Sequence, residues 1–202
     1  TKQLQKMAAS MNSPMYGVLS AVLYNTVKEI TGNDVVTLSH RMHGRVLDNN
    51  MYMDTVGNFA INYPIAIDTT NKGFESMVST FNNKLRKVPM NGASYDLCGK
   101  ELGDSHYPGN KVTDIRINYL GNRDVSNLNY IELNSENDGQ RFSTADQVRT
   151  SEIEVFFYLE NGCMNIGIEY SKERCKEKDI RQLMDLYVFY AGHLSEDVKE
   201  IV

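Results

Sequence analysis

The chain has 202 residues, 41% of them hydrophobic and 23% charged, which is typical of one globular domain or one large lobe. The formal net charge is −5 and no Lys/Arg cluster is present, so no nucleic-acid partner is expected. The sequence also contains no apolar run long enough to cross a bilayer, so no membrane partner is expected. Three cysteines without a CxxC pair indicate neither a zinc ribbon nor a disulfide framework, so we expect a cytoplasmic protein. Because Thr1 is not an initiator methionine, we expect a fragment of a longer protein.

The first half of the chain switches between helical and extended patterns. Apolar residues recur at helical spacing up to Gly32, which stands where a helix stops, and Ser13 is placed to cap the same helix. Further on, apolar and less apolar residues alternate as in a half-buried strand, and Pro64 places that strand at a sheet edge or at a bulge. The expected elements are a helix at residues 14–30, a strand at 34–42, a loop at 43–55, a strand at 59–68, a helix at 74–87 and a short helix at 92–101.

The second half contains the clearest local signal, a β-hairpin. Two alternating runs flank Asn161 and Gly162, the residue pair that a type I′ turn prefers because both positions need a positive φ. The expected elements are a strand at residues 115–119, a polar stretch at 122–151 with one strand near 130–133, hairpin strands at 153–159 and 164–170, and a helix at 179–194. The predicted fold class is α/β (α+β), one unit with a mixed or antiparallel sheet flanked by helices.

The four histidines do not predict a metal site. His40 and His43 lie three apart in a predicted strand and therefore point to opposite faces of the sheet. His106 lies in a Gly/Pro/Asp loop and His193 on the last helix, where both are expected to be ordinary surface or boundary residues.

Other catalytic motifs are absent from the sequence. It contains no Gly-x-Ser-x-Gly, no Gly-x-Gly-x-x-Gly and no phosphate-binding loop. Glu152 and Glu154 fall on one face of a predicted strand, and we expect that face to be the solvated side of the hairpin. These residues alone name no reaction.

Four strings resemble the C-terminal half of epimerization domains in non-ribosomal peptide synthetases. Residues 55–64, Thr-Val-Gly-Asn-Phe-Ala-Ile-Asn-Tyr-Pro, resemble that family's T-V-G-W-F-T-x-x-Y-P, and residues 88–95, Val-Pro-Met-Asn-Gly-Ala-Ser-Tyr, resemble V-P-x-x-G-x-x-Y. Residues 117–121, Ile-Asn-Tyr-Leu-Gly, resemble F-N-Y-L-G, and residues 42–45, Met-His-Gly-Arg, resemble the end of E-G-H-G-R. Some of these strings have counterparts in condensation domains as well.

The resemblance implies a fold like that of chloramphenicol acetyltransferase, with residues 1–202 as a single lobe, the C-terminal half of a two-lobed domain. The implied substrates are aminoacyl or peptidyl thioesters on the phosphopantetheine of carrier domains, and the chain itself binds no cofactor or metal. The implied partners are the missing N-terminal lobe, peptidyl carrier protein domains and adjacent synthetase modules. The family's general base lies in an H-H-x-x-x-D-G string that these residues lack, so we expect the isolated chain to be inactive and to expose an apolar surface that allows self-association.

The resemblance assigns functional roles to Tyr119, Asn118 and Arg45. Asn118 and Tyr119 would orient the substrate by hydrogen bonds, although Tyr119 also continues an apolar alternation and could be part of the core. Arg45 would position a substrate or a carrier phosphate, or would pin its loop to a carboxylate. The family's glutamate, expected to take part in proton transfer at Cα, is replaced by Arg41, which cannot act as a base, and its tryptophan is replaced by Asn58. Condensation, or a degenerate relative of the epimerase branch, therefore fits better than epimerization.

Two other readings remain open at this point. The replacement at Arg41 also fits a non-catalytic lobe that only docks carrier proteins. A free-standing acetyltransferase-like enzyme would need a catalytic histidine near its C-terminus, for which His193 is the candidate, but the acidic motif that should follow His193 is missing.

Overall fold

The computed structural model describes residues 1–45, 54–70, 73–95, 113–123 and 150–197. The described helices are α1 (Lys2–Ser10), α2 (Met15–Thr31), α3 (Phe74–Arg86) and α5 (Glu177–Asp197), with a 3₁₀ turn, η1, at Pro89–Gly92. The described strands are β1 (Val35–His43), β2 (Ala60–Asp68), β3 (Ile115–Asn122), β4 (Ile153–Glu160) and β5 (Cys163–Tyr170). These bounds confirm the helices, strands and hairpin predicted from the sequence within the described ranges.

The strands form one mixed sheet in the order β2-β1-β3-β4-β5. β1 is antiparallel to β2 and parallel to β3, while β4 is parallel to β3 and antiparallel to β5. The prediction of a mixed or antiparallel sheet is thus resolved as mixed. β2 is an edge strand, which confirms the position predicted from Pro64. A proline has no N–H to donate to a further strand, so it is tolerated where no further strand pairs.

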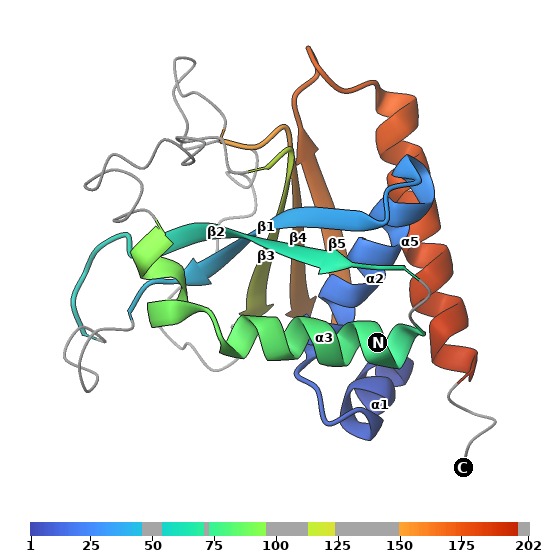
Figure 1. Ribbon diagram of the computed structural model, residues 1–202, viewed down its shortest axis with the longest axis horizontal. Helices are drawn as coiled ribbons and strands as arrows, with labels where there is room; N and C mark the ends of the chain where they lie inside the picture. Colours follow the sequence, from blue (N-terminus) through green and yellow to red (C-terminus); the bar gives the residue numbers. More distant parts are fainter. Residues whose placement is uncertain (46–53, 71–72, 96–112, 124–149, 198–202) are drawn as a thin grey trace.

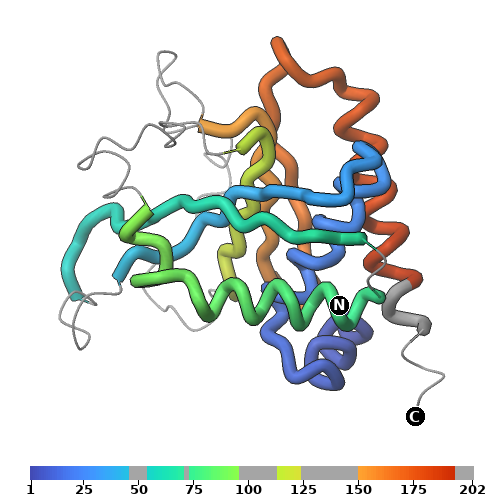
Figure 2. Tube along the Cα trace, in the orientation of Figure 1, coloured from blue at the N-terminus to red at the C-terminus, as the bar shows by residue number. Residues whose placement is uncertain are grey.

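The helices pack on one face of this sheet. Tyr24 of α2 and Phe81 of α3 both contact His40 of β1, and Tyr187 of α5 contacts Phe157 of β4. His40 lies opposite Ile117 of β3, and Phe157 lies opposite Tyr119, two residues further along β3. His40 and Phe157 therefore point to the same face of the sheet. Figure 1 shows α5 running beside the sheet and α3 crossing it, and Figure 2 shows the first and last helices close together, where α1 contacts α5. The buried core therefore lies between this helical layer and one sheet face.

The ends of α2 were only half predicted. Gly32 follows the helix with φ 68°, a left-handed cap that glycine adopts without steric cost. Ser13 does not cap the first turn, because Pro14 takes the N-cap position without a side-chain cap hydrogen bond. The Ser13 hydroxyl instead accepts a 2.8 Å hydrogen bond from the Asn82 amide of α3. A tertiary contact therefore replaces the local one.

The β4–β5 turn confirms the hairpin prediction, with φ of 51° at Asn161 and 71° at Gly162. Helix α1, by contrast, was not predicted. Its Met7 is 1% exposed, and the Thr1 hydroxyl accepts a 2.8 Å hydrogen bond from the backbone N–H of Met164. The N-terminal segment is thus joined to β5 by contacts far apart in the sequence.

Several predictions lie outside the described residues. They are most of the loop at 43–55, the strand near 130–133 and the surroundings of His106. The short helix expected at 92–101 is helical at residues 93–95, and its remainder is outside. Across the described part of the chain, no helix combines the length and the apolar character that a bilayer crossing needs.

Candidate functional site

A cavity of about 510 Å³ opens at one edge of the sheet, where β1 and β3 end and β2 begins. β1 and β3 are parallel neighbours with Arg41 opposite Asn118, so their carboxyl ends meet at this edge. β2 is antiparallel to β1, which brings its first residue, Ala60, opposite His43. The cavity is lined by Arg41, Met42, His43, Arg45, Phe59, Ala60, Asn118, Tyr119 and Leu120. Three of the four family-like strings therefore supply its wall.

Two glycines of these strings are fixed by contact with aromatic residues. A Cβ on Gly92, whose φ is +95°, would lie 1.9 Å from Cδ1 of Tyr63. A Cβ on Gly44 would lie 2.2 Å from the carbonyl oxygen of Phe59, which accepts a 2.7 Å hydrogen bond from the Gly44 N–H. A larger residue at either position would have to displace its neighbour. The string at residues 88–95, which does not line the cavity, thus contacts the string at residues 55–64 through Gly92 and Tyr63.

The structure brings Arg45, Asn118 and Tyr119 together in this cavity. The Tyr119 ring is half-buried and stacks on Tyr16 of α2, with centroids 5.9 Å apart. Tyr119 therefore belongs both to the edge of the core and to the cavity wall, and the two alternatives considered from the sequence are not exclusive. The Arg45 guanidinium lies 4.1 Å from the centroid of the Phe59 ring, a cation–π contact that fixes the chain after β1.

Glu154 is the common partner of three polar side chains beside the cavity. One of its carboxylate oxygens accepts a hydrogen bond from Arg116, and the other accepts one from the Asn118 amide at 3.2 Å. Arg41 lies 3.7 Å from the oxygen that Asn118 bonds. Asn118 is thus positioned by a carboxylate on the neighbouring strand.

The sequence interpretation of Glu154 was therefore wrong. Its side chain is only 16% exposed, because β3 pairs with β4 and sets Arg116 directly opposite Glu154. Glu152 precedes β4 and forms an ion pair of 3.0 Å with Arg174. These carboxylates are ion-paired, half-buried groups and not the solvated face of a hairpin.

A buried polar network lies on the helix-covered face, next to Tyr119. The Tyr16 hydroxyl lies 2.5 Å from Nδ1 of His40, and the Tyr24 hydroxyl lies 2.9 Å from Nε2. Tyr24 donates its one proton to the carbonyl of Ile65 at 2.7 Å, so Nε2 must carry the imidazole proton and Nδ1 must accept from Tyr16. Burial lowers the pKa of His40 to about 3 and raises the pKa of both tyrosines. His40 is therefore neutral with a single tautomer.

This network was missed from the sequence, although Tyr16 and Tyr24 lie eight residues apart on the buried stripe of one helix and His40 alternates with apolar residues of β1. His40 and His43 point to opposite faces, as predicted, and His43 is exposed. Within the described ranges no group of three potential metal ligands occurs. His193 is exposed and stacks on Phe189, with ring centroids 3.9 Å apart, consistent with the expected surface residue.

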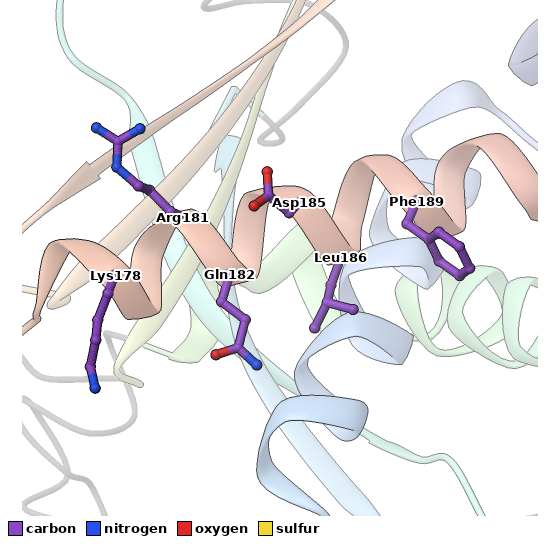
Figure 3. Close-up of a pocket in the computed structure, with 6 residues that line it drawn as sticks. All are labelled: Lys178, Arg181, Gln182, Asp185, Leu186 and Phe189. Carbon is purple, nitrogen blue, oxygen red and sulfur yellow. The ribbon is translucent and has the colours of Figure 1, made fainter.

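A second hollow, of about 550 Å³, lies along the outer surface of α5 (Figure 3). Its lining residues are Lys178, Arg181, Gln182, Asp185, Leu186 and Phe189, all from this one helix. Arg181 is already paired with Glu177 one turn away. Of these two hollows, the cavity at the sheet edge is the one that brings together polar groups from different elements, so that cavity is the candidate site.

The chain matches one protein family along nearly its whole length. The Condensation domain family matches residues 1–195, and the chain belongs to this family. Surfactin synthase subunit 1 of Bacillus subtilis (strain 168) is 24% identical over 197 residues, which cover 93% of this chain and 5% of that protein.

Two solved structures have the same fold. The epimerization domain from the third module of tyrocidine synthetase B has a TM-score of 0.75 at 21% identity, covering 97% of this chain and 45% of the solved chain. The first condensation domain of the calcium-dependent antibiotic synthetase has a TM-score of 0.69 at 17% identity, covering 98% and 42%. These proteins confirm the predicted relationship to condensation and epimerization domains of peptide synthetases and the chloramphenicol acetyltransferase-like fold. The chain spans less than half of each solved chain and a small part of the synthase.

Proposed function

We propose that this chain forms the C-terminal lobe of a two-lobed condensation- or epimerization-type domain in a non-ribosomal peptide synthetase. The observation that carries the proposal is the convergence of family-like strings on one cavity, at the shared carboxyl edge of β1 and β3. The share of the solved relatives that the chain covers, 45% and 42%, fits one lobe of such a domain.

The substrates of the whole domain are aminoacyl or peptidyl thioesters carried on phosphopantetheine arms. In condensation, an amine attacks the thioester carbonyl, a bond forms between nitrogen and carbon, and the thiol leaves. Asn118 and Tyr119 orient the substrate at the cavity wall, and Arg45 fixes the segment that borders it. Glu154 holds the Asn118 amide in place, so this donor is pre-organised and needs little rearrangement on binding.

The general base comes from the other lobe in this proposal. The 202 residues contain no H-H-x-x-x-D-G string. His40, a buried histidine near the site, is neutral and hydrogen-bonded to tyrosine hydroxyls through both ring nitrogens. General base catalysis contributes about 10²–10⁴-fold, so the chain alone should have no measurable turnover. The partners are accordingly the N-terminal lobe, peptidyl carrier protein domains and adjacent modules in the cytoplasm.

The site favours condensation over epimerization. Arg41 stands where the family's proton-transfer glutamate is expected, and its guanidinium lies 3.7 Å from Glu154. Arginine remains protonated in proteins and cannot remove the Cα proton that epimerization requires. The neighbouring carboxylate of Glu154 is held by Arg116 and Asn118 and is therefore a poor substitute.

A second candidate is a carrier-docking lobe without catalytic function. The same replacement at Arg41 favours it, because an ion pair now occupies the place of a reactive carboxylate. The two candidates differ in their sensitivity to the cavity wall, since a docking lobe does not need the Tyr119 hydroxyl.

The test uses the longer protein that contains this chain, carrier-loaded substrates and a product assay. Tyr119→Phe should lower turnover about tenfold or more, as expected for the loss of one positioned hydrogen bond. Tyr158→Phe is the matched control, because Tyr158 lies on the opposite sheet face under Arg123 and does not line the cavity. Equal turnover of both variants would favour the docking lobe.

A further inference from the structure

The cavity at the sheet edge is cationic. Its described lining contains the guanidinium groups of Arg41 and Arg45 and no carboxylate. The remaining wall includes Phe59 and Leu120, which offer apolar surface beside these charges. A ligand that matches the wall therefore combines an anionic group with an apolar or neutral part.

The charge of Arg41 is not balanced within its own cluster. Glu154 is the common acceptor, and its two oxygens are already bonded by Arg116 and Asn118. Arg41 lies farther away, at 3.7 Å, and its side chain is 33% exposed compared with 13% for Arg116. Two arginines share one carboxylate, so the cluster carries one surplus positive charge on its exposed, cavity-lining member.

We infer that this cavity binds an oxyanion, a carboxylate or a phosphate, through the guanidinium of Arg41. A guanidinium presents parallel N–H donors that match the two oxygens of such a group. The inference rests on the proposed function only for the origin of the ligand, which is either an acidic group of the carried substrate or the phosphate of the pantetheine arm.

Four small probes test the site and separate the two origins. The arginine Nε–Hε resonances of the 202-residue chain are followed during titrations with 4′-phosphopantetheine, pantetheine, N-acetylglutamate and N-acetylglutamine. Saturable shifts of the Arg41 resonance by at least one anionic probe, with none by its neutral twin, support the site. Binding of phosphopantetheine alone assigns the arm phosphate, and binding of N-acetylglutamate assigns an acidic substrate. No saturation below about 10 mM by either anion would overturn the inference.

Two variants act in opposite directions. Arg41→Gln should weaken binding about tenfold or more, because a charge-assisted contact is lost. Glu154→Gln should tighten it several-fold, because the competing carboxylate is removed; weaker binding in this variant would contradict the inference. Arg181→Gln is the control, since that arginine is 74% exposed on α5 and lies outside the cavity. Absence of binding by the chain, with product still formed by the longer protein that contains it, would reject the oxyanion site and leave the proposed function intact.

Discussion

Acidification should destabilise the protein through His40. The imidazole is buried, and both ring nitrogens bond to tyrosine hydroxyls in the neutral form. Its pKa falls from 6.5 to about 3 because burial disfavours the cation. The unfolded chain therefore binds this proton at higher pH than the folded chain, and stability is lost as the pH falls below 6.5.

The magnitude follows from the two pKa values. Between pH 6.5 and about pH 4.5 the loss is about 2 kcal/mol, because the slope rises to about 1.4 kcal/mol for each pH step only after the unfolded histidine is mostly protonated. This is a large part of the roughly 5–15 kcal/mol that stabilises an ordinary domain. Urea unfolding at both pH values measures it.

His40→Gln removes the titrating group and should flatten this part of the pH dependence, whatever its own cost in stability. His43→Gln is the matched control, because it removes an exposed histidine three residues further along the same strand. An equal loss of stability in wild type and His40→Gln over this pH range would refute the argument.

Other predictions concern packing and the polar network. Gly92→Ala should cost about 2 kcal/mol or more of stability, because the new Cβ would collide with the Tyr63 ring at a φ of +95°. Gly192→Ala, with open space around its Cβ, should instead stabilise α5 by up to about 1 kcal/mol. Similar unfolding midpoints for the two variants would contradict this. Phe157→Ala should cost about 3–5 kcal/mol, because the ring is fully buried against Tyr187, and a loss below about 1 kcal/mol in chemical unfolding would mean that the core is wrongly placed. Tyr24→Phe should cost about 1–3 kcal/mol by leaving the Ile65 carbonyl without its donor, and an unchanged stability would contradict the assigned network.

Much of the fold could be predicted from the sequence because its signals are local. The Asn161–Gly162 pair specifies the β4–β5 hairpin by itself, and Gly32 specifies the end of α2. Helix α1 was missed because much of its stabilisation comes from packing on α2 and α5 and from the bond between Thr1 and Met164, which no local pattern contains. Long-range pairing is thus the information that the sequence pattern lacks.

The candidate site shows the same division. The family-like strings predicted functional roles for Arg45, Asn118 and Tyr119, and these three residues line one cavity. The environment of Glu154 could not be predicted, because its partner Arg116 is 38 residues away and becomes adjacent only through the parallel pairing of β3 and β4. A half-buried charge cluster of this kind follows from sheet topology rather than from local sequence.

The most direct measurement is product formation from matched carrier-loaded substrates by the 202-residue chain and by the longer domain that contains it. The proposed two-lobe function predicts product with the longer domain and none with the chain alone, because Asn118, Tyr119 and Arg45 can orient a substrate but cannot act as its base. Turnover by the chain alone would contradict this function, since all of the chemistry would then have to lie within these residues.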